Sequence, residues 1–414
     1  MRFHESCNVA RSALLAISVL GAGLAITGSA SAQVPPNIES ELIKIGKIVD
    51  PACTAKLYRP LMPQNDITSS ATPLYPGITI ARDVSFGPDP KDVVDVFAAD
   101  KGPASRPVLI FVPGGGGDKI EIHNKESNAF YDNIMRWATK NGMVGVNMQR
   151  HAGPGWDAGA KDVSHMIQWV QANVAKYHGN PERMFIWAHS AGNMPLGTYI
   201  GHPELYGPKG VGVKGVIFMS PAAFDIAPVK VDAGSPADFM KMMAAAGKTC
   251  GHAKGLMGSD GALPGKAPGQ PGGPPTAGLF GGPPPSGAGG PPAGAPPGAA
   301  GGPPPGGPPA GPPGMGPPVD EATLLARSSL PELKKTSAKI MLANAELDIG
   351  ADPALNNMQP FIKALHDELC KSGPEHCPAT LMAKGHSHMS VVFSIDTPDT
   401  TVSDPILAWM KSVK

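Results

Sequence analysis

The chain has 414 residues, and its 34 lysines and arginines balance 34 aspartates and glutamates, so the formal net charge is zero. A balanced charge gives the protein no net electrostatic attraction to nucleic acid or to an anionic membrane surface, so neither is expected as a partner. The length is sufficient for a large hydrophobic core.

The first 32 residues have the pattern of a secretory signal peptide. A basic start precedes an apolar run of small residues at 13–26, and residues 30–32 form an A-x-A cleavage site. The run is shorter than the ~20 residues that a membrane span needs, so we expect cleavage after Ala32 rather than an anchor. The mature protein is then exported, to the periplasm or to the medium. No later segment is apolar for long enough to span a bilayer.

Four cysteines remain after removal of Cys7 with the signal peptide. An even number in an exported chain predicts two disulfides, with three pairings open. Cys370 and Cys377 are close in sequence and form the favoured local pair, which leaves Cys53 with Cys250. Metal binding by these residues is not expected, because no C-x-x-C pair occurs.

Apolar runs and helical patterns alternate beyond an N-terminal extension at 33–75. The expected strands lie at 78–86, 93–97, 108–112, 142–148, 184–187, 213–219, 339–344 and 379–382. Helical spacing of apolar residues falls between them, for example at 128–141 and 360–369. The first two strands are expected to be antiparallel and the later ones parallel, which predicts an α/β fold with a mostly parallel sheet between layers of helices.

A low-complexity segment at 258–318 divides this domain into two parts, 76–257 and 319–414. The segment is mostly glycine and proline without a three-residue repeat. Such a composition cannot bury enough apolar surface to offset its ordering entropy, and it predicts a disordered insert. We expect a spacer or tether. The alternative is a segment that contacts a partner or the cell wall.

The strand at 184–187 ends at the pentapeptide A-H-S-A-G, residues 188–192. This is the G-x-S-x-G pattern with alanine in the first position. In that pattern a tight turn from strand to helix exposes a serine hydroxyl at the end of the sheet, and only small residues fit two positions before and after it. Ser190 is therefore the candidate nucleophile. The alternative is a serine in an ordinary loop.

Glycine-rich sequence at 113–117 follows the central strand at 108–112. Backbone N–H groups in such a run are open to a ligand, and we expect Gly115 and Gly116 to donate to an oxyanion. The N–H of Ala191, at the start of the helix after Ser190, is the third expected donor. A phosphate-binding loop is not expected, because no G-K-[ST] follows.

Two acids and two histidines are candidates for the remaining catalytic roles. Glu346 and Asp348 follow the strand at 339–344, where a carboxylate can orient a histidine. His386 and His388 follow the last strand, where a histidine can act as the general base for the serine. The H-x-H pair also suits a metal, but no further ligands at matching spacing accompany it.

The order Ser190, Asp348, His388 resembles that of the α/β-hydrolases of the carboxylesterase and lipase group. Within that group the chain is most similar to the hormone-sensitive-lipase and kynurenine-formamidase-like branch. F-V-P-G-G-G at 111–116 resembles the F-V-H-G-G-G oxyanion loop of the family, and G-D-K follows it. A-E-L-D at 345–348 resembles the A-E-x-D motif that carries the catalytic acid in the family, which favours Asp348 over Glu346. H-M-S at 388–390 resembles the H-x-S motif that carries the family's histidine, which favours His388 over His386.

Two departures from the family pattern are visible, since Pro113 replaces the histidine of the oxyanion loop and Ala188 replaces the first glycine of the serine motif. Neither removes a reacting group. The resemblance implies hydrolysis of a small-molecule carboxylic ester through an acyl-enzyme, and it implies no metal or organic cofactor. His151, Trp156 and His189 are candidate pocket residues, against the alternative of loop or structural residues.

Two other functions stay open from the sequence. The first is an amide-cleaving hydrolase of the same fold, either an arylformamidase or a peptidase. Asn193 argues against the peptidase, because that branch usually has a second glycine at this position. The second is a hydrolase fold without catalysis that serves in adhesion, for which the intact serine, acid and histidine are unfavourable.

Overall fold

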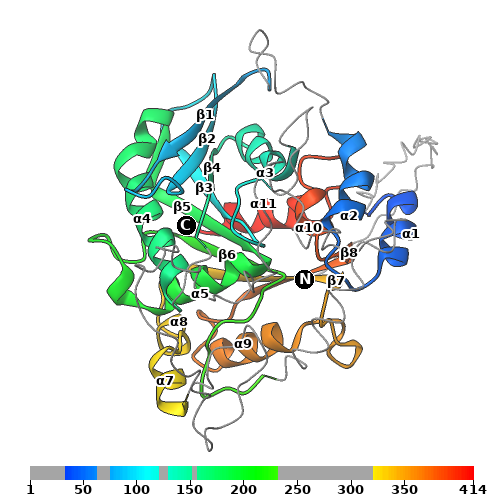
Figure 1. Cartoon of the computed structure of the whole chain (residues 1–414), viewed down its shortest axis with the longest axis vertical. Coiled ribbons are helices and arrows are strands. Elements are labelled where there is room, and N and C mark those ends of the chain that lie inside the picture. The colour runs from blue at the N-terminus through cyan, green and yellow to red at the C-terminus, as the bar shows by residue number, and fades with distance from the viewer. Residues whose placement is uncertain (1–32, 63–74, 121–128, 152–155, 232–319) are drawn as a thin grey trace, which may run out of the picture. The chain divides into compact units, whose positions relative to one another are not determined.

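The computed structural model describes residues 33–62, 75–120, 129–151, 156–231 and 320–414. Within them, eight strands form one sheet in the order β1-β2-β4-β3-β5-β6-β7-β8 (Figure 1). The strands are β1 Ile78–Ser85, β2 Val93–Ala99, β3 Arg106–Val112, β4 Val144–Met148, β5 Gly179–His189, β6 Gly215–Met219, β7 Lys339–Leu347 and β8 Ala379–Ser387. The predicted signal peptide, the Gly/Pro insert and Cys250 lie outside the described residues.

The sheet is antiparallel at one edge and parallel elsewhere, which confirms the predicted fold class. Strand β1 pairs with β2 and β2 with β4 in antiparallel fashion, and every later pair is parallel. The central strands are continuous apolar runs, because helices cover both of their faces. Alternate side chains of β3 enter opposite cores: Leu109 and Phe111 lie in one, and Val108 and Ile110 in the other.

Helices form the two outer layers (Figure 1). One core includes apolar residues of α1, α2, α3 and α11, and the other includes those of α4, α5, α8 and α9. The helices are α1 Pro36–Ile45, α2 Pro51–Tyr58, α3 Ala129–Lys140, α4 Ala158–Asn173, α5 Asn193–Gly201, α7 Glu321–Ala326, α8 Leu330–Leu333, α9 Pro360–Cys370, α10 Ser390–Phe393 and α11 Ser403–Ser412. None of the described helices is long and apolar enough to cross a membrane.

The segment expected to be an N-terminal extension contributes two helices to the core. Leu42 of α1 and Tyr58 of α2 are fully buried. Each helix has a proline at its first position, Pro36 and Pro51, where the missing N–H costs nothing. The Tyr58 hydroxyl donates to Asp399 Oδ2 at 3.1 Å. Helix α1 packs against β8, and α2 packs against α10, which follows β8.

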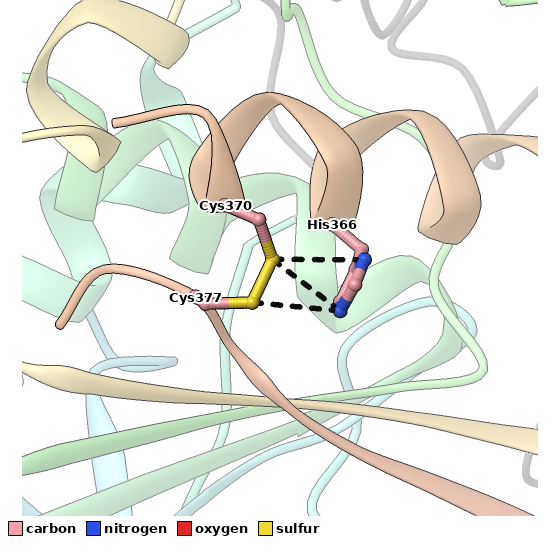
Figure 2. A group of neighbouring side chains, drawn as sticks. All are labelled: His366, Cys370 and Cys377. Carbon is pink, nitrogen blue, oxygen red and sulfur yellow. Dashed lines mark hydrogen bonds between the residues drawn. A yellow bond between two sulfur atoms is a disulfide. The ribbon is translucent and has the colours of Figure 1, made fainter. Parts of the chain in front are cut away.

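A disulfide joins Cys370, the last residue of α9, to Cys377, just before β8 (Figure 2). The His366 ring lies alongside, with Nε2 at 3.5 Å from Cys370 Sγ. Cys53 is also disulfide-bonded. Its expected partner, Cys250, is not among the described residues.

We predict that the double variant C370S/C377S unfolds with a free energy lower by about 2 kcal/mol, because an open loop leaves the unfolded chain more freedom. Urea unfolding of both proteins under non-reducing conditions measures the difference. The single variant S372A, an exposed serine within the same loop, is the control. Equal stability of the double variant and the wild type would contradict the prediction.

Candidate active site

Ser190 lies at a sharp turn between a strand and a helix. Strand β5 ends at His189, a single 3-10 turn covers Ser190–Gly192, and α5 follows. The φ angle of Ser190 is 52°, in the left-handed region that non-glycine residues rarely adopt. Strain of this kind is frequent at functional sites, and here it places the side chain at the carboxyl end of the sheet.

Small residues surround the turn because neighbouring backbone lies against it. A Cβ atom on Gly192 would stand 2.5 Å from the carbonyl oxygen of Val112 and 2.6 Å from that of Pro113. A Cβ atom on Gly114 would stand 2.9 Å from the Cβ of Ser190. The glycine loop after β3 is thus packed directly against the serine.

A continuous hydrogen-bonded chain links Ser190, His388 and Asp348. The Ser190 Oγ atom is 2.8 Å from His388 Nε2, and His388 Nδ1 is 2.7 Å from Asp348 Oδ1. Asp348 is fully buried, and its Oδ1 also accepts the N–H of Ile349 at 2.7 Å. With Nδ1–H donating to the carboxylate, Nε2 is free to accept the serine proton.

The competing acid and base candidates lie elsewhere. Glu346 Oε2 accepts the N–H of Gly385 at 2.9 Å and so anchors the segment that carries the histidines. His386 is fully buried, with Nδ1 at 2.9 Å from Ser390 Oγ and Nε2 at 3.6 Å from Asp399 Oδ2. Both side chains support the loop of His388, and no described contact joins either of them to Ser190.

Arg150, just after β4, holds the glycine loop in place. Its Nε donates to Pro113 O at 2.9 Å, and its Nη2 donates to Gly115 O at 2.8 Å and Gly114 O at 3.2 Å. The C=O and N–H of a trans peptide point in opposite directions, so the N–H groups of Gly115 and Gly116 face away from Arg150. Among the described residues neither of these two N–H groups has an acceptor. Gly115 and Gly116 therefore stay the candidate oxyanion donors.

The Arg150 guanidinium is buried. Burial lowers its pKa to about 10, so the group stays charged at neutral pH and donates to three carbonyls. Sequence reasoning missed this residue. Pro113 was the feature of the sequence that could have indicated it. Proline has no side-chain donor to order the glycine loop, so a residue elsewhere in the chain must do so.

The strand order and the placement of serine, acid and histidine at the ends of β5, β7 and β8 are those of the α/β-hydrolase fold. The chain has this fold. Residues 94–258, which include Ser190, match the family model BD-FAE. Esterase LipC of Mycobacterium tuberculosis is 32% identical over 114 residues, which cover 27% of this chain and 27% of that protein.

A further relative of this α/β-hydrolase is the chlorogenic acid esterase of Aspergillus niger, 30% identical over 109 residues that cover 24% of this chain and 20% of that protein. The matches span about a quarter of the length of these relatives. Among solved structures, Esterase B from Lactobacillus rhamnosis has a TM-score of 0.48 at 12% identity, covering 91% of this chain and 96% of that one. A truncated carbohydrate esterase from gut microbiota has a TM-score of 0.45 at 13% identity, covering 81% and 95%.

His151 and Trp156 do not contact the triad among the described residues. His151 lies within a group of carboxylates, and the Trp156 ring packs edge-on against His202 with centroids 4.7 Å apart. Their pocket roles stay predictions. Within the described part of the chain, two groups have the spacing of metal ligands, namely Asp92, His151 and Asp162, and His366 with the disulfide sulfurs (Figure 2).

His189, a candidate pocket residue from the sequence, is a structural residue instead. Its side chain is fully buried and exposes no surface to a substrate. Its Nε2–H donates to the carbonyl of His388 at 2.9 Å, and the two rings lie 4.9 Å apart. Burial, assisted by repulsion from His388, holds the pKa of His189 well below the usual range. The neutral ring supports the His388 backbone.

This burial predicts a sensitivity to acid. Below about pH 6.5 the unfolded chain binds a proton at position 189 that the folded protein does not, so the free energy of unfolding decreases as the pH falls. We expect the wild type to lose about 1.4 kcal/mol per pH unit more than H189Q between pH 6 and pH 5. Urea unfolding at several pH values measures both slopes. The variant H165Q, at an exposed histidine, keeps the wild-type slope, and parallel slopes for H189Q would refute the assignment.

Proposed function

We propose that this α/β-hydrolase is a serine carboxylesterase, with Ser190 as nucleophile, His388 as general base and Asp348 as the acid that orients it. The observation that carries the proposal is the unbroken chain of hydrogen bonds, 2.8 Å and 2.7 Å long, through the three side chains. The relatives that match part of the sequence are esterases, which favours an ester over an amide as the substrate.

The reaction begins when Ser190 Oγ attacks the ester carbonyl while His388 Nε2 takes the hydroxyl proton. The negative charge that forms on the carbonyl oxygen is stabilised by the N–H groups of Gly115, Gly116 and Ala191. His388 then gives the proton to the leaving alcohol, and an acyl-enzyme remains. Water, deprotonated by His388, attacks the acyl group, and the acid leaves as Ser190 regains its proton.

Two features make this chemistry efficient. Asp348 is buried, so its negative charge stabilises protonated His388 with little screening by water. The Gly115 and Gly116 donors are fixed in advance by Arg150, and a fixed donor to an oxyanion lowers the barrier by about 3 kcal/mol. We propose that the enzyme acts outside the cytosol. The predicted signal peptide supports this, as does the disulfide between Cys370 and Cys377.

The variant S190A tests the function. We expect kcat/KM for p-nitrophenyl acetate, butyrate and octanoate to fall at least about 10⁴-fold, because the nucleophile is absent. The variant S40A, at an exposed serine, is the control with wild-type rates. Equal ester hydrolysis by S190A and the wild type would overturn the proposal. Turnover of N-formyl or aminoacyl amides without turnover of esters would favour the amide-cleaving alternative.

The variant R150K tests the role of Arg150 as a positioning residue. Lysine keeps the charge but cannot hold three carbonyls in the geometry of a guanidinium. We expect kcat to fall about 100-fold with little change in KM, because the oxyanion donors act mainly in the transition state. The exposed substitution R183K is the control. A lower Tm with kcat retained would show that Arg150 serves only the fold.

A further inference from the structure

A second group of side chains that could bind a ligand lies outside the triad. It brings together three segments that are distant in sequence: the turn between β1 and β2, the residue after Arg150, and the first turns of α4. The side chains are Asp89, Asp92, His151 and Asp162. The proposed ester hydrolysis uses none of them.

Three atoms of this group have the spacing of metal ligands. His151 Nδ1 is 3.1 Å from Asp162 Oδ2 and 3.7 Å from Asp92 Oδ1, and the ligand atoms of the three residues all lie within 4.8 Å of one another. Ligands bound tetrahedrally to zinc at 2.0–2.2 Å are separated from each other by about 3.3–3.6 Å. The two measured separations bracket that range.

The carboxylate of Asp92 has one oxygen that is open to a ligand. Its side chain is only 6% exposed. Its Oδ2 accepts the N–H of Asp89 at 3.1 Å, but among the described residues no hydrogen bond reaches Oδ1, which faces His151. The Asp162 side chain is also buried, and within the described chain His151 alone forms ion pairs with these carboxylates. Asp92 and Asp162 are the two buried carboxylates of the group, and a metal ion bound between them would be a partner for both charges.

Asp89 occupies the position of an outer-shell carboxylate. Its Oδ1 lies 3.2 Å from His151 Nε2, the ring nitrogen that faces away from Asp162 and Asp92. A histidine that binds a metal usually gives its other N–H to a carboxylate, which fixes the tautomer and makes the ligand nitrogen more basic. With the Nε2 proton directed to Asp89, the lone pair of Nδ1 would face Asp162 and Asp92 and could bind a metal.

We propose that Asp92 Oδ1, His151 Nδ1 and Asp162 Oδ2 bind one Zn²⁺ ion, with water as the fourth ligand and Asp89 holding the second ring nitrogen. An imidazole among carboxylates favours zinc over calcium and magnesium, which take oxygen ligands. The ion links the β1–β2 turn to α4 and fixes the residue next to Arg150. Its role is to stabilise the loop that supports the oxyanion donors. Sequence analysis expected no metal, because these ligands do not form a local motif.

The test uses the full mature chain without a histidine tag, kept under non-reducing conditions. After treatment with EDTA and removal of the chelator, the protein is incubated with ZnCl₂ and desalted, and its zinc content is measured by mass spectrometry. We expect about one zinc per chain and a rise in Tm of about 5 °C at zinc concentrations 100 times the dissociation constant. Calcium and magnesium are tested in parallel.

Variants assign the ion to this site. H151Q removes a ligand and is expected to abolish both the bound zinc and the rise in Tm. D89N changes a half-exposed side chain that is not a ligand, so the protein should fold, and we expect zinc affinity to fall 10- to 100-fold. H366Q is the matched control. It changes the histidine of the other group that has the spacing of metal ligands. The sulfurs beside His366 form a disulfide and are not thiolate ligands (Figure 2).

Zinc bound by H366Q but not by H151Q, with weaker binding by D89N, supports the site. Three results would overturn it: no zinc retained by the wild type, zinc retained equally by H151Q, or a rise in Tm with calcium or magnesium but not with zinc. Ester hydrolysis is measured separately on the same samples. A protein that binds zinc but hydrolyses no ester would refute the proposed function and leave the metal site standing.

Discussion

The candidate site depends on one buried guanidinium. Arg150 turns the carbonyls of the glycine loop toward itself, and the planarity of the peptide then turns the N–H groups of Gly115 and Gly116 the other way. Glycine alone does not achieve this, because it allows many conformations. The glycine-rich composition allows the loop many conformations, and a side chain from the segment after β4 selects one of them. Pro113 fits the same arrangement, since it contributes a carbonyl to Arg150.

The histidine side of the site is fixed by a different set of buried polar groups. The segment that carries His388 is held at its start by Glu346, through the Gly385 N–H, and underneath by His189, through the carbonyl of His388 itself. Asp399 adds a third support, because it faces His386 and accepts the hydroxyl of Tyr58 from α2. Buried polar groups that are paired in this way restrict a loop to one conformation. The N-terminal helices thus contribute to the geometry of the site.

Sequence patterns predicted the parts that depend on local order. Apolar runs gave the strands, and Ser190, Asp348 and His388 could each be placed at a strand end because chemistry-bearing residues follow those runs directly. The patterns failed where the cause is long-range. The mixed composition of residues 33–75 predicts an extension, although Pro36 and Pro51 suit the first turn of a helix. Arg150 and the burial of His189 result from packing between strands that no single segment reveals.

The strained conformation of Ser190 is the last consequence of this packing. A non-glycine residue in the left-handed region costs about 1–3 kcal/mol, so the surroundings must stabilise it. The carbonyl of Ser190 accepts the Asn193 amide at 2.8 Å and the N–H of Ala222 at 3.2 Å, while the same amide donates to Met219 O at 2.9 Å. Asn193 thereby fastens the turn to the end of β6. These hydrogen bonds explain why an asparagine follows Gly192. The position of Ser190 is fixed by the ends of both β5 and β6 and not by the turn alone.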